Sequence, residues 1–424
     1  MQPETAEQTQ QLSQEELQKR EALDFTRTKA DIISYIRQYI PHVTDEQINK
    51  WTQDKLLEGK VVNGNFLYFK QAAPNLFRVC DTCRTIKEAK EGKEIKKELE
   101  DVRLQIAEIS SPLHKRGLFN PVRMRVTYTI TVHPDAVPSG EEIRCWLPFP
   151  HKGIPRQKNI KLLSVNSQSY YINNQKERTH AYVFMQKKAV AKQPTVFSEE
   201  FEYTSYAQYI PVDPSKVLPY DKSSPLYQQY TRESQPHLTL SPQIHHLATN
   251  IIGNEKNPYM QARLLFDYVD RFPWASAREY STLKNIPEYV LQNKKGDCGQ
   301  QTLLFIALCR SIGIPAHFQS GFMMHPNATN LHDWCEIYLN GYGWIPVDVS
   351  FGKYPFAHNE AERYFYFGGI DNYRMVVNQN FSGQLDHKLD VRSETVDFQR
   401  GEVEWNGGNL YFDKWSWNIK ISYK

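Results

Sequence analysis

The stretch from residue 296 to residue 351 constrains the fold most, because it joins a buried helix to a pair of strands. Cys298 directly precedes an apolar run with helical spacing, and Gly313 and Pro315 end this run in the order typical of a helix end. The sequence therefore places Cys298 at the N-terminus of a buried helix. Unpaired N–H groups and the helix dipole favour a thiolate there, so we expect Cys298 to be the one strongly acidified thiol.

The second half of this stretch predicts a β-hairpin that carries a histidine and a carboxylate. Residues 332–339 alternate as in a strand, Asn340-Gly341 is a turn signal, and residues 344–349 form the return strand. With a three-residue loop that ends at Gly341, His332 lies directly opposite Asp348, and cross-strand partners share a face of the sheet. A register slip of one residue would put the two side chains on opposite faces.

Together these residues predict a nucleophile, a base and an orienting group. A carboxylate beside an imidazole fixes its tautomer and stabilises the imidazolium. The sequence therefore predicts Cys298 as the nucleophile, His332 as the base and Asp348 as the group that orients His332. Trp334, two residues after His332, is predicted on the same face as a wall of the substrate groove.

The motifs around these residues carry a resemblance to a known family. GDC at the helix start, then LCRSIGIPA, HDW and GYGWIPVD occur in the order Cys, His, Asp between about residues 260 and 352. In combination they resemble the transglutaminase-like superfamily of papain-related cysteine enzymes. The resemblance implies an α+β fold, in which the helix of Cys298 packs against an antiparallel sheet bearing the histidine and the aspartate. In this family a side chain upstream of the cysteine helps the cysteine's own N–H to stabilise the oxyanion. Trp274 and Tyr280 are the local candidates for that side chain, or else plain groove-wall aromatics.

The length of the chain, 424 residues, is too great for one ordinary core, so two to four domains are expected. We predict an N-terminal helical region with a hairpin over residues 1–115 and a β-sandwich-like domain over residues 116–212. The transglutaminase-like catalytic core follows over residues 213–380, and C-terminal β strands over residues 381–424 pack on this core. Many bacterial transglutaminase-like proteins carry a sandwich before the catalytic core, and the resemblance implies the same arrangement here.

The N-terminal region combines helices with a hairpin. Thr44 and Gln47 have the spacing of a capping box, and Asn63-Gly64 is a turn signal between two apolar runs. A charged run over residues 88–109 predicts a solvated helix. This order resembles a winged helix, but the net charge is only +3 and the region has no basic patch. We therefore expect a packing or lid role and no nucleic-acid partner.

The cysteines suggest no metal centre. Cys80 and Cys83 form a single CxxC motif, and a zinc site would need two more ligands of similar type. The sequence has no second CxxC and no close histidine pair, so we expect a local redox pair or two ordinary cysteines rather than zinc. Eukaryotic transglutaminases use calcium, but no loop here has the dense oxygen-ligand pattern of a calcium site. We therefore predict no metal and no other cofactor.

Charged residues near the C-terminus alternate with aromatic ones. Alternation of this kind is typical of a strand with one face in solvent. The residues therefore either line a substrate groove or, as we favour, form the exposed face of closing strands. They are Asp397, Arg400, Glu402 and Glu404.

Two further features bear on the location of the protein. No run approaches the ~20 apolar residues needed to span a bilayer, so no transmembrane segment is predicted. The first residues, QPETAEQTQQLSQEEL, resemble a solvated linker of the kind that follows an export signal. We therefore expect an exported protein (periplasmic, cell-surface or secreted), although a native cytosolic start fits the same residues.

The function predicted from these features is cysteine-dependent acyl transfer. The protein would hydrolyse a peptide, isopeptide or related amide through a thioester on Cys298, so its partner is a protein or peptide substrate. A true transglutaminase, which joins glutamine to an amine, is the first alternative. A catalytically inactive core that serves as a binding scaffold is the second. The sequence predicts neither the substrate side chain nor the oligomeric state.

Overall fold

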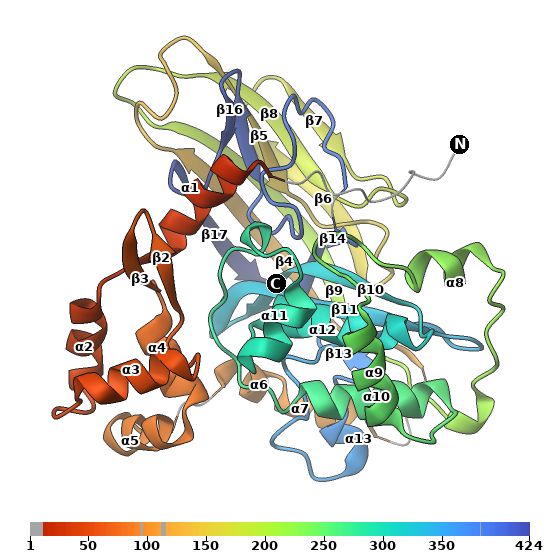
Figure 1. The fold of residues 1–424 in the computed structure, drawn as a ribbon. Helices are drawn as coiled ribbons and strands as arrows, with labels where there is room; N and C mark the ends of the chain where they lie inside the picture. Colours follow the sequence, from red (N-terminus) through yellow and green to blue (C-terminus); the bar gives the residue numbers. More distant parts are fainter. Residues whose placement is uncertain (1–11, 94–95, 112–115, 382) are drawn as a thin grey trace.

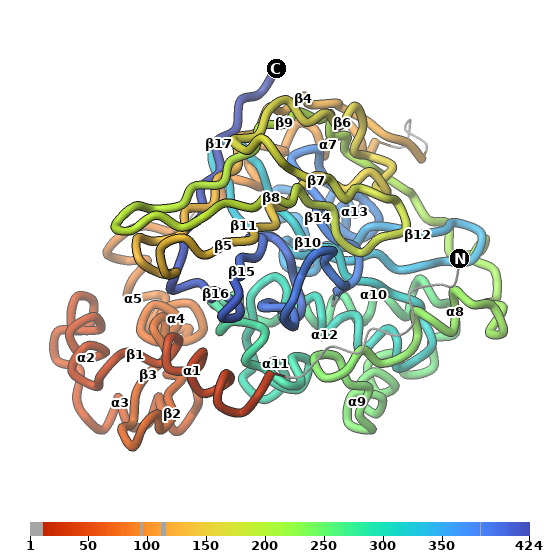
Figure 2. The backbone as a smooth tube through the Cα atoms, turned by 90° about the horizontal axis from the view of Figure 1, so that it is seen from above, coloured from red at the N-terminus to blue at the C-terminus, as the bar shows by residue number. Residues whose placement is uncertain are grey.

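The computed structural model describes residues 12–93, 96–111, 116–381 and 383–424. The chain forms an N-terminal unit, a β-sandwich and a third unit, which carries Cys298, His332 and Asp348 and is called the catalytic unit after that prediction (Figure 1). In Figure 2 the sandwich strands lie on one face of the catalytic sheet and the helices of the catalytic unit on the other, with the N-terminal unit to one side. Of the polar start on which the export prediction rests (residues 2–17), residues 2–11 lie outside the described residues, and residues 14–17 form the beginning of a helix. Among those described, no helix is both long and apolar enough to cross a membrane.

The N-terminal unit combines short helices with a three-stranded sheet. The predicted hairpin is present, since Asn63 and Gly64 at its turn both adopt positive φ. The predicted capping box is also present, because the side chains of Thr44 and Gln47 each accept from the other residue's backbone N–H. The elements are α1 (Gln14–Asp24), β1 (Phe25–Arg27), α2 (Lys29–Arg37), α3 (Asp45–Gln53), β2 (Gly59–Val62), β3 (Asn65–Phe69), α4 (Ala72–Val79), α5 (Asp81–Glu91), α6 (Lys97–Asp101) and α7 (Arg103–Ile109), with strand order β1-β3-β2.

The charged run over residues 88–109 forms several short helices instead of the one solvated helix predicted. Helix α5 ends before Gly92, which adopts a φ of 85°, and α6 and α7 follow; residues 94–95 lie outside the description. The run is also partly buried, because Leu99 and Ile106 pack in one cluster with Phe351 of the catalytic unit. This packing brings the start of α6 close to the candidate site.

The β-sandwich consists of two antiparallel sheets around a shared apolar core. The alternation predicted over residues 123–132 is present, and its buried side chains pack against those of the opposite sheet. One sheet has the order β13-β9-β4-β17, with β6 paired to β9; the other has the order β16-β15-β5-β8-β7. The strands are β4 (Gly117–Val132), β5 (Glu142–Pro148), β6 (Gln157–Val165), β7 (Tyr170–Asn173), β8 (Tyr182–Lys188), β9 (Thr195–Tyr209), β13 (Gly369–Ile370), β15 (Glu402–Trp405), β16 (Gly408–Leu410) and β17 (Trp415–Tyr423).

The C-terminal strands belong to the sandwich. The sequence placed residues 381–424 on the catalytic core, but β17 pairs along β4 and β15 pairs with β5. The segment before these strands contacts the catalytic unit through residues such as Val396 and Gln399, and β17 contacts it through Trp417 and Tyr423. The alternation in this region does identify strands, but strand pairing between residues about 290 positions apart is not encoded in any local pattern.

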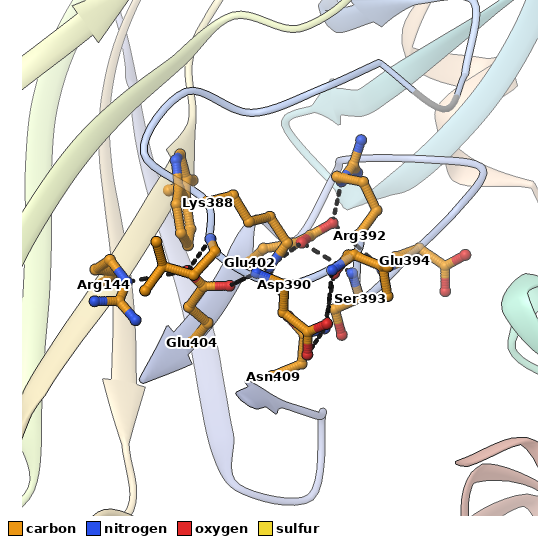
Figure 3. Close-up of polar contacts among 12 residues, drawn as sticks. Arg144, Lys388, Asp390, Arg392, Ser393, Glu394, Glu402, Glu404 and Asn409 are labelled. Carbon is orange, nitrogen blue, oxygen red and sulfur yellow. Dashed lines mark hydrogen bonds and ion pairs between the residues drawn. The ribbon is translucent and has the colours of Figure 1, made fainter. Parts of the chain in front are cut away.

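The charged residues of β15 are buried, so the prediction of an exposed face is wrong for them. Glu402 accepts from Arg392 and from Lys388, and Glu404 accepts from Lys388 and from Arg144 (Figure 3). Backbone N–H groups of the loop that precedes β15 donate to both carboxylates as well. These carboxylates hold the loop over the strand, which a sequence pattern could not reveal because the covering segment is itself polar.

The catalytic unit packs a buried helix against a four-stranded antiparallel sheet, as the α+β prediction requires. The sheet has the order β12-β11-β10-β14, with β10 (Ala316–His325), β11 (Ala328–Leu339), β12 (Gly343–Val347) and β14 (Arg374–Gln379). Helix α12 (Cys298–Ser311) lies in the centre of the unit and is buried from Gly299 to Arg310. The surrounding helices are α8 (Pro225–Tyr230), α9 (Pro242–Ile252), α10 (Pro258–Val269), α11 (Ile286–Asn293) and α13 (Glu360–Arg363).

Candidate active site

Helix α12 begins at Cys298, where the sequence placed the candidate nucleophile. Asp297 is the N-cap: its carboxylate accepts from Gln300 N at 3.0 Å, and the Gln300 side chain accepts from Asp297 N. The helix ends as predicted, with Gly313 at a φ of 83°. Cys298 is half-buried, whereas the helix behind it is enclosed by the core. The cap fixes the position of the thiol on a rigid element.

The hairpin of β11 and β12 brings His332 to Asp348, although not in the predicted register. Leu339 pairs with Gly343, so the loop lies one residue later than expected, and the last ladder pair is Cys335 with Val347. This slip changes each pairing by two residues and therefore keeps both side chains on the same face. His332 Nε2 lies 2.7 Å from Asp348 Oδ2, just beyond the end of the ladder.

Asp348 has a second partner, a cationic one, that the sequence did not indicate. Arg374, on β14, donates from Nη1 to Asp348 Oδ2 at 2.8 Å, and both side chains are fully buried. Backbone N–H groups of Ser350 and Phe351 donate to the other carboxylate oxygen. Burial alone would raise the pKa of Asp348, but His332 and Arg374 outweigh it and hold this pKa below its usual value. Asp348 is therefore ionised at neutral pH.

His332 is held as a neutral imidazole between aromatic rings. Burial lowers its pKa; Asp348 acts in the opposite direction, and Arg374 adds to the lowering. Trp334 stacks on the imidazole with 5.8 Å between ring centroids, and its Nε1 donates to Gln319 Oε1. Trp334 lies on the predicted face, but it is fully buried and so shields the histidine rather than lining an open groove.

The thiol of Cys298 is not acidified, in contrast to the expectation from its helix position. Its Sγ lies 3.6 Å from Asp333 Oδ2 and donates to that carboxyl group. Burial raises the pKa of Cys298 well above its usual value, and the carboxyl groups of Asp333 and Asp297 raise it further. Burial and the two carboxyl groups thus act against the thiolate that the helix N-terminus favours. The resting pair is a thiol and a neutral imidazole.

Tyr280, a candidate oxyanion donor, lies behind the nucleophile instead of in the groove. Its buried hydroxyl is 2.8 Å from Asp297 Oδ1 and 3.2 Å from Asp333 Oδ2. One hydroxyl proton serves only one carboxylate, so the second contact requires a proton on a carboxyl group. Burial accordingly raises the pKa of Asp297 to about 7 and that of Asp333 well above its usual value. Gly299 permits this packing, since an added Cβ would lie 2.3 Å from the Tyr280 hydroxyl.

The acidic cluster behind the site continues into the segment that precedes β15. Gln399 donates from its amide to Asp333 Oδ1 and to the backbone oxygen of His332, so it joins β11 to this segment. Burial, reinforced by Asp397 and Glu279, raises the pKa of Glu394 to about 8. Arg400 forms two contacts with Glu279. The sequence offered Asp397 and Arg400 only as one alternative, as residues lining a substrate groove, and it gave no signal for Glu394, Gln399 or Glu279, because their segments reach the site through tertiary packing.

The raised pKa of Glu394 predicts a pH dependence of stability. In the unfolded chain this carboxyl loses its proton near pH 4.3, whereas the folded chain keeps it up to about pH 8. Between these values the folded state binds one more proton, so stability falls as pH rises, by up to about 1.4 kcal/mol per pH unit. Glu394→Gln should flatten the fall in unfolding free energy between pH 5 and pH 8, measured by urea denaturation. Glu100→Gln, at an exposed site, should leave the slope unchanged.

A cavity of about 410 Å³ brings Cys298 and His332 together. Trp274, the other oxyanion candidate, lies on its wall and is 40% exposed. Other walls come from the start of β11, from the turn after Asp348, and from the N-terminal unit, which contributes Arg78, Lys96 and Glu98. Sequence analysis had no signal for these last residues, because they reach the site only through tertiary packing.

Metal binding has no evident place in the part of the chain that the structure describes. No group of three or more His, Cys, Asp or Glu side chains is arranged there to hold a metal ion. Cys80 and Cys83 are both free thiols at the start of α5. Cys80 is half-exposed and its Sγ lies 3.2 Å from Thr82 Oγ1, whereas Cys83 is buried.

Cys80 should react before Cys298 with a neutral alkylating agent at pH 7. Burial works to raise the pKa of Cys80, but hydrogen bonds with Cys83 and Thr82 lower it overall. The pKa of Cys298 is raised, and burial raises that of Cys83 to about 12. Iodoacetamide labelling followed by peptide mapping should therefore mark Cys80 first. Faster labelling of Cys298 would mean that the helix dipole outweighs its carboxyl neighbours.

Comparison with known proteins identifies the family of one part of the chain. Residues 245–349 match the family model of the transglutaminase-like superfamily, so this part of the chain is a transglutaminase-like core. An uncharacterised protein of Haemophilus influenzae is 24% identical over 261 residues, which is 50% of this chain and 66% of that protein. A candidate cysteine protease from Cytophaga hutchinsonii has a TM-score of 0.49 and 14% identity, covering 73% of this chain and 92% of its own. The periplasmic domain of TgpA from Pseudomonas aeruginosa has a TM-score of 0.28 and 14% identity, with coverages of 58% and 91%.

Proposed function

We propose that the protein is a cysteine-dependent acyl-transfer enzyme that hydrolyses a peptide, isopeptide or related amide through a thioester on Cys298. The observation that carries this proposal is that Cys298 and His332 line one cavity, while Asp348 binds the imidazole at Nε2. Nδ1 is then free to take a proton from the thiol. A nucleophile, a base and a group that orients the base are the three parts that covalent acyl transfer needs.

The reaction begins from neutral groups, because the pKa of Cys298 is raised and that of His332 is lowered. As Sγ attacks the amide carbonyl, its proton moves to His332 Nδ1, and ionised Asp348 stabilises the imidazolium. The attack turns the carbonyl oxygen into an oxyanion, and the unpaired N–H groups at the start of α12 donate hydrogen bonds to it. His332 then protonates the leaving amine. A water molecule, deprotonated by His332, attacks the thioester, releases the acid and restores the thiol.

Hydrolysis is favoured over amine transfer by the carboxylates near the site. A lysine acceptor would need a free carboxylate beside the cavity, and Asp333 and Glu336 are the nearest ones in the sequence of β11. Glu336 already binds His317 Nε2 at 2.9 Å and Gln319 Nε2 at 3.0 Å. Asp333 is buried and bound by Gln399. Neither is available to a substrate amine. Glu98, the one carboxylate on the cavity wall, lies there with the cations Arg78 and Lys96, which repel an ammonium group, so water is the expected acceptor.

The branch between water and amine can be measured directly. Glutamine-containing peptides and proteins are incubated in H₂¹⁸O with a labelled primary amine, and the products are analysed by mass spectrometry. Hydrolysis puts ¹⁸O into a new carboxyl group, whereas transfer puts the labelled amine into the product. We expect ¹⁸O to dominate at millimolar amine and both products to vanish in Cys298→Ala. Dominant amine incorporation would make the protein a transglutaminase instead. Binding of peptides that survives in Cys298→Ala, without product from the natural protein, would support the scaffold alternative.

A further inference from the structure

The N-terminal unit is fixed against the wall of the cavity by one buried side chain. Asn75, on α4, is 1% exposed and pairs with Ser276 in both directions. Its amide donates to Ser276 O at 2.9 Å, and its carbonyl accepts from Ser276 N at 2.9 Å. Ser276 lies two residues after Trp274, which lines the cavity. Helix α4 therefore has a set position relative to the candidate nucleophile.

Arg78 extends from the same helix into the cavity, one turn after Asn75. Its guanidinium lies over the ring of Trp274, with 4.7 Å to the centroid, and Nη1 contacts Ser276 Oγ at 3.0 Å. It forms no ion pair with any of the residues that the structure describes. A stacked guanidinium held at one nitrogen keeps the rest of its planar N–H fork for a ligand, and that fork matches a carboxylate.

The remaining charges of the cavity give it a cationic excess. Lys96 is exposed and has no ion pair within the described residues, and Glu98 is the one carboxylate on the walls. We propose that Arg78, assisted by Lys96, binds a carboxylate that the substrate carries close to the scissile amide. This inference rests on the proposed function, since it assumes that Cys298 attacks an amide in the same cavity. The carboxylate belongs either to an acidic side chain or to the end of the substrate chain.

The first test measures the charge preference of the cavity without any turnover. Iodoacetate and iodoacetamide alkylate the same thiolate. The ratio of their rate constants at Cys298 therefore does not depend on the pKa of that thiol. In Arg78→Gln the ratio of iodoacetate to iodoacetamide should fall about three- to tenfold, because one cation near an anionic reagent is lost. The alkylation is carried out at pH 9, and peptide mapping then distinguishes the label on Cys298 from the label on the other cysteines. Salt should lower the ratio in the natural protein.

Arg27→Gln is the matched control, because Arg27 is exposed in the same unit and forms no ion pair among the described residues. Arg27→Gln should leave the ratio of the two rate constants unchanged. Arg78→Lys should give a ratio between those of the natural protein and Arg78→Gln. Thermal melts show whether Arg78→Gln remains folded. A folded Arg78→Gln protein with an unchanged ratio would overturn the carboxylate site, whether or not the protein proves to be a hydrolase.

The second test distinguishes the two sources of the carboxylate. Three peptides are compared: one with an acidic residue beside the scissile amide and an amidated end, one with neutral residues and a free end, and one with neither carboxylate. One of the first two should have a kcat/KM at least tenfold above the third, and Arg78→Gln should remove that advantage mainly through KM. Equal values for all three, with turnover present, would contradict the inference but leave the hydrolase proposal standing. No turnover of any peptide, with the alkylation ratio still dependent on Arg78, would count against the hydrolase alone.

Discussion

Replacement of Cys298 by alanine should lower kcat/KM for amide hydrolysis by about 10⁴- to 10⁶-fold, because the thioester can no longer form. Cys298 is the thiol that shares the cavity with His332, and the Asp348 carboxylate holds that imidazole in place. The side chain is half-buried and only one atom is lost, so the fold should persist. The measurement is steady-state hydrolysis of the peptide found to react fastest with the natural protein, together with a melting curve.

Cys80→Ser is the matched control for this change. Cys80 is also half-exposed and has the lowered pKa that Cys298 lacks, so it is the other thiol able to act as a nucleophile. The Cys80→Ser variant should retain nearly all of the hydrolytic activity. A loss of activity in Cys80→Ser with retention in Cys298→Ala would exchange their roles and remove the proposed mechanism.

Local patterns in the sequence were sufficient for the parts of the site that are close together in the chain. The helix start at Cys298 follows from capping and apolar spacing, and the hairpin of His332 follows from alternation around a turn. The loop lies one residue later than predicted, so each cross-strand pairing differs from the prediction by two positions. A shift of two positions leaves the side chains of His332 and Asp348 on the same face of the sheet. The matching family model then identifies the core that these motifs suggested.

The sequence could not indicate the groups that reach the site from distant segments. Arg374 comes from β14, which joins the catalytic sheet by pairing with β10, and Arg78 comes from the N-terminal unit. No local period distinguishes these arginines from surface ones. The same limit explains the wrong prediction for the thiol. The helix position of Cys298 favours a thiolate, but its burial and its contact with the Asp333 carboxyl group, both of which arise only on folding, raise its pKa.

Arg374 is a buried cation that binds two buried carboxylates, one of which is Asp348 of the candidate triad. Its Nη1 donates to Asp348 and its Nε donates to Asp371 at 2.9 Å, and all three side chains are fully buried. Asp371 also contacts His325 Nε2 at 3.2 Å. Burial would raise the pKa of Asp371, but Arg374 and His325 outweigh it and lower this pKa. One guanidinium thus keeps two buried carboxylates ionised.

Arg374→Met should lower the free energy of unfolding by about 3–5 kcal/mol, since it leaves Asp348 and Asp371 buried without their shared cation. Both carboxylates have lowered pKa values in the fold, so their contribution is present above the unfolded pKa near 3.9 and is lost as pH falls through the folded values. The cost of the substitution, measured by urea denaturation, should therefore be largest at neutral pH and shrink below pH 4. Without Arg374, burial favours the protonated form of Asp348. A protonated Asp348 no longer stabilises the imidazolium of His332, so the hydrolytic activity should also fall.

Arg156→Met provides the comparison that separates loss of the ion pairs from loss of a buried arginine. Arg156 is also buried and lies 5.8 Å from the ring of Trp334, but it forms no ion pair with a described carboxylate, and burial lowers its pKa to about 10. Its replacement should cost much less than that of Arg374 and show no such dependence on pH. The double variant Arg374→Met with Asp371→Asn should regain part of the stability, because one unpaired carboxylate is removed. Equal costs for the two arginines across pH 3–8 would show that packing, and not the charge on Asp348 and Asp371, accounts for the effect.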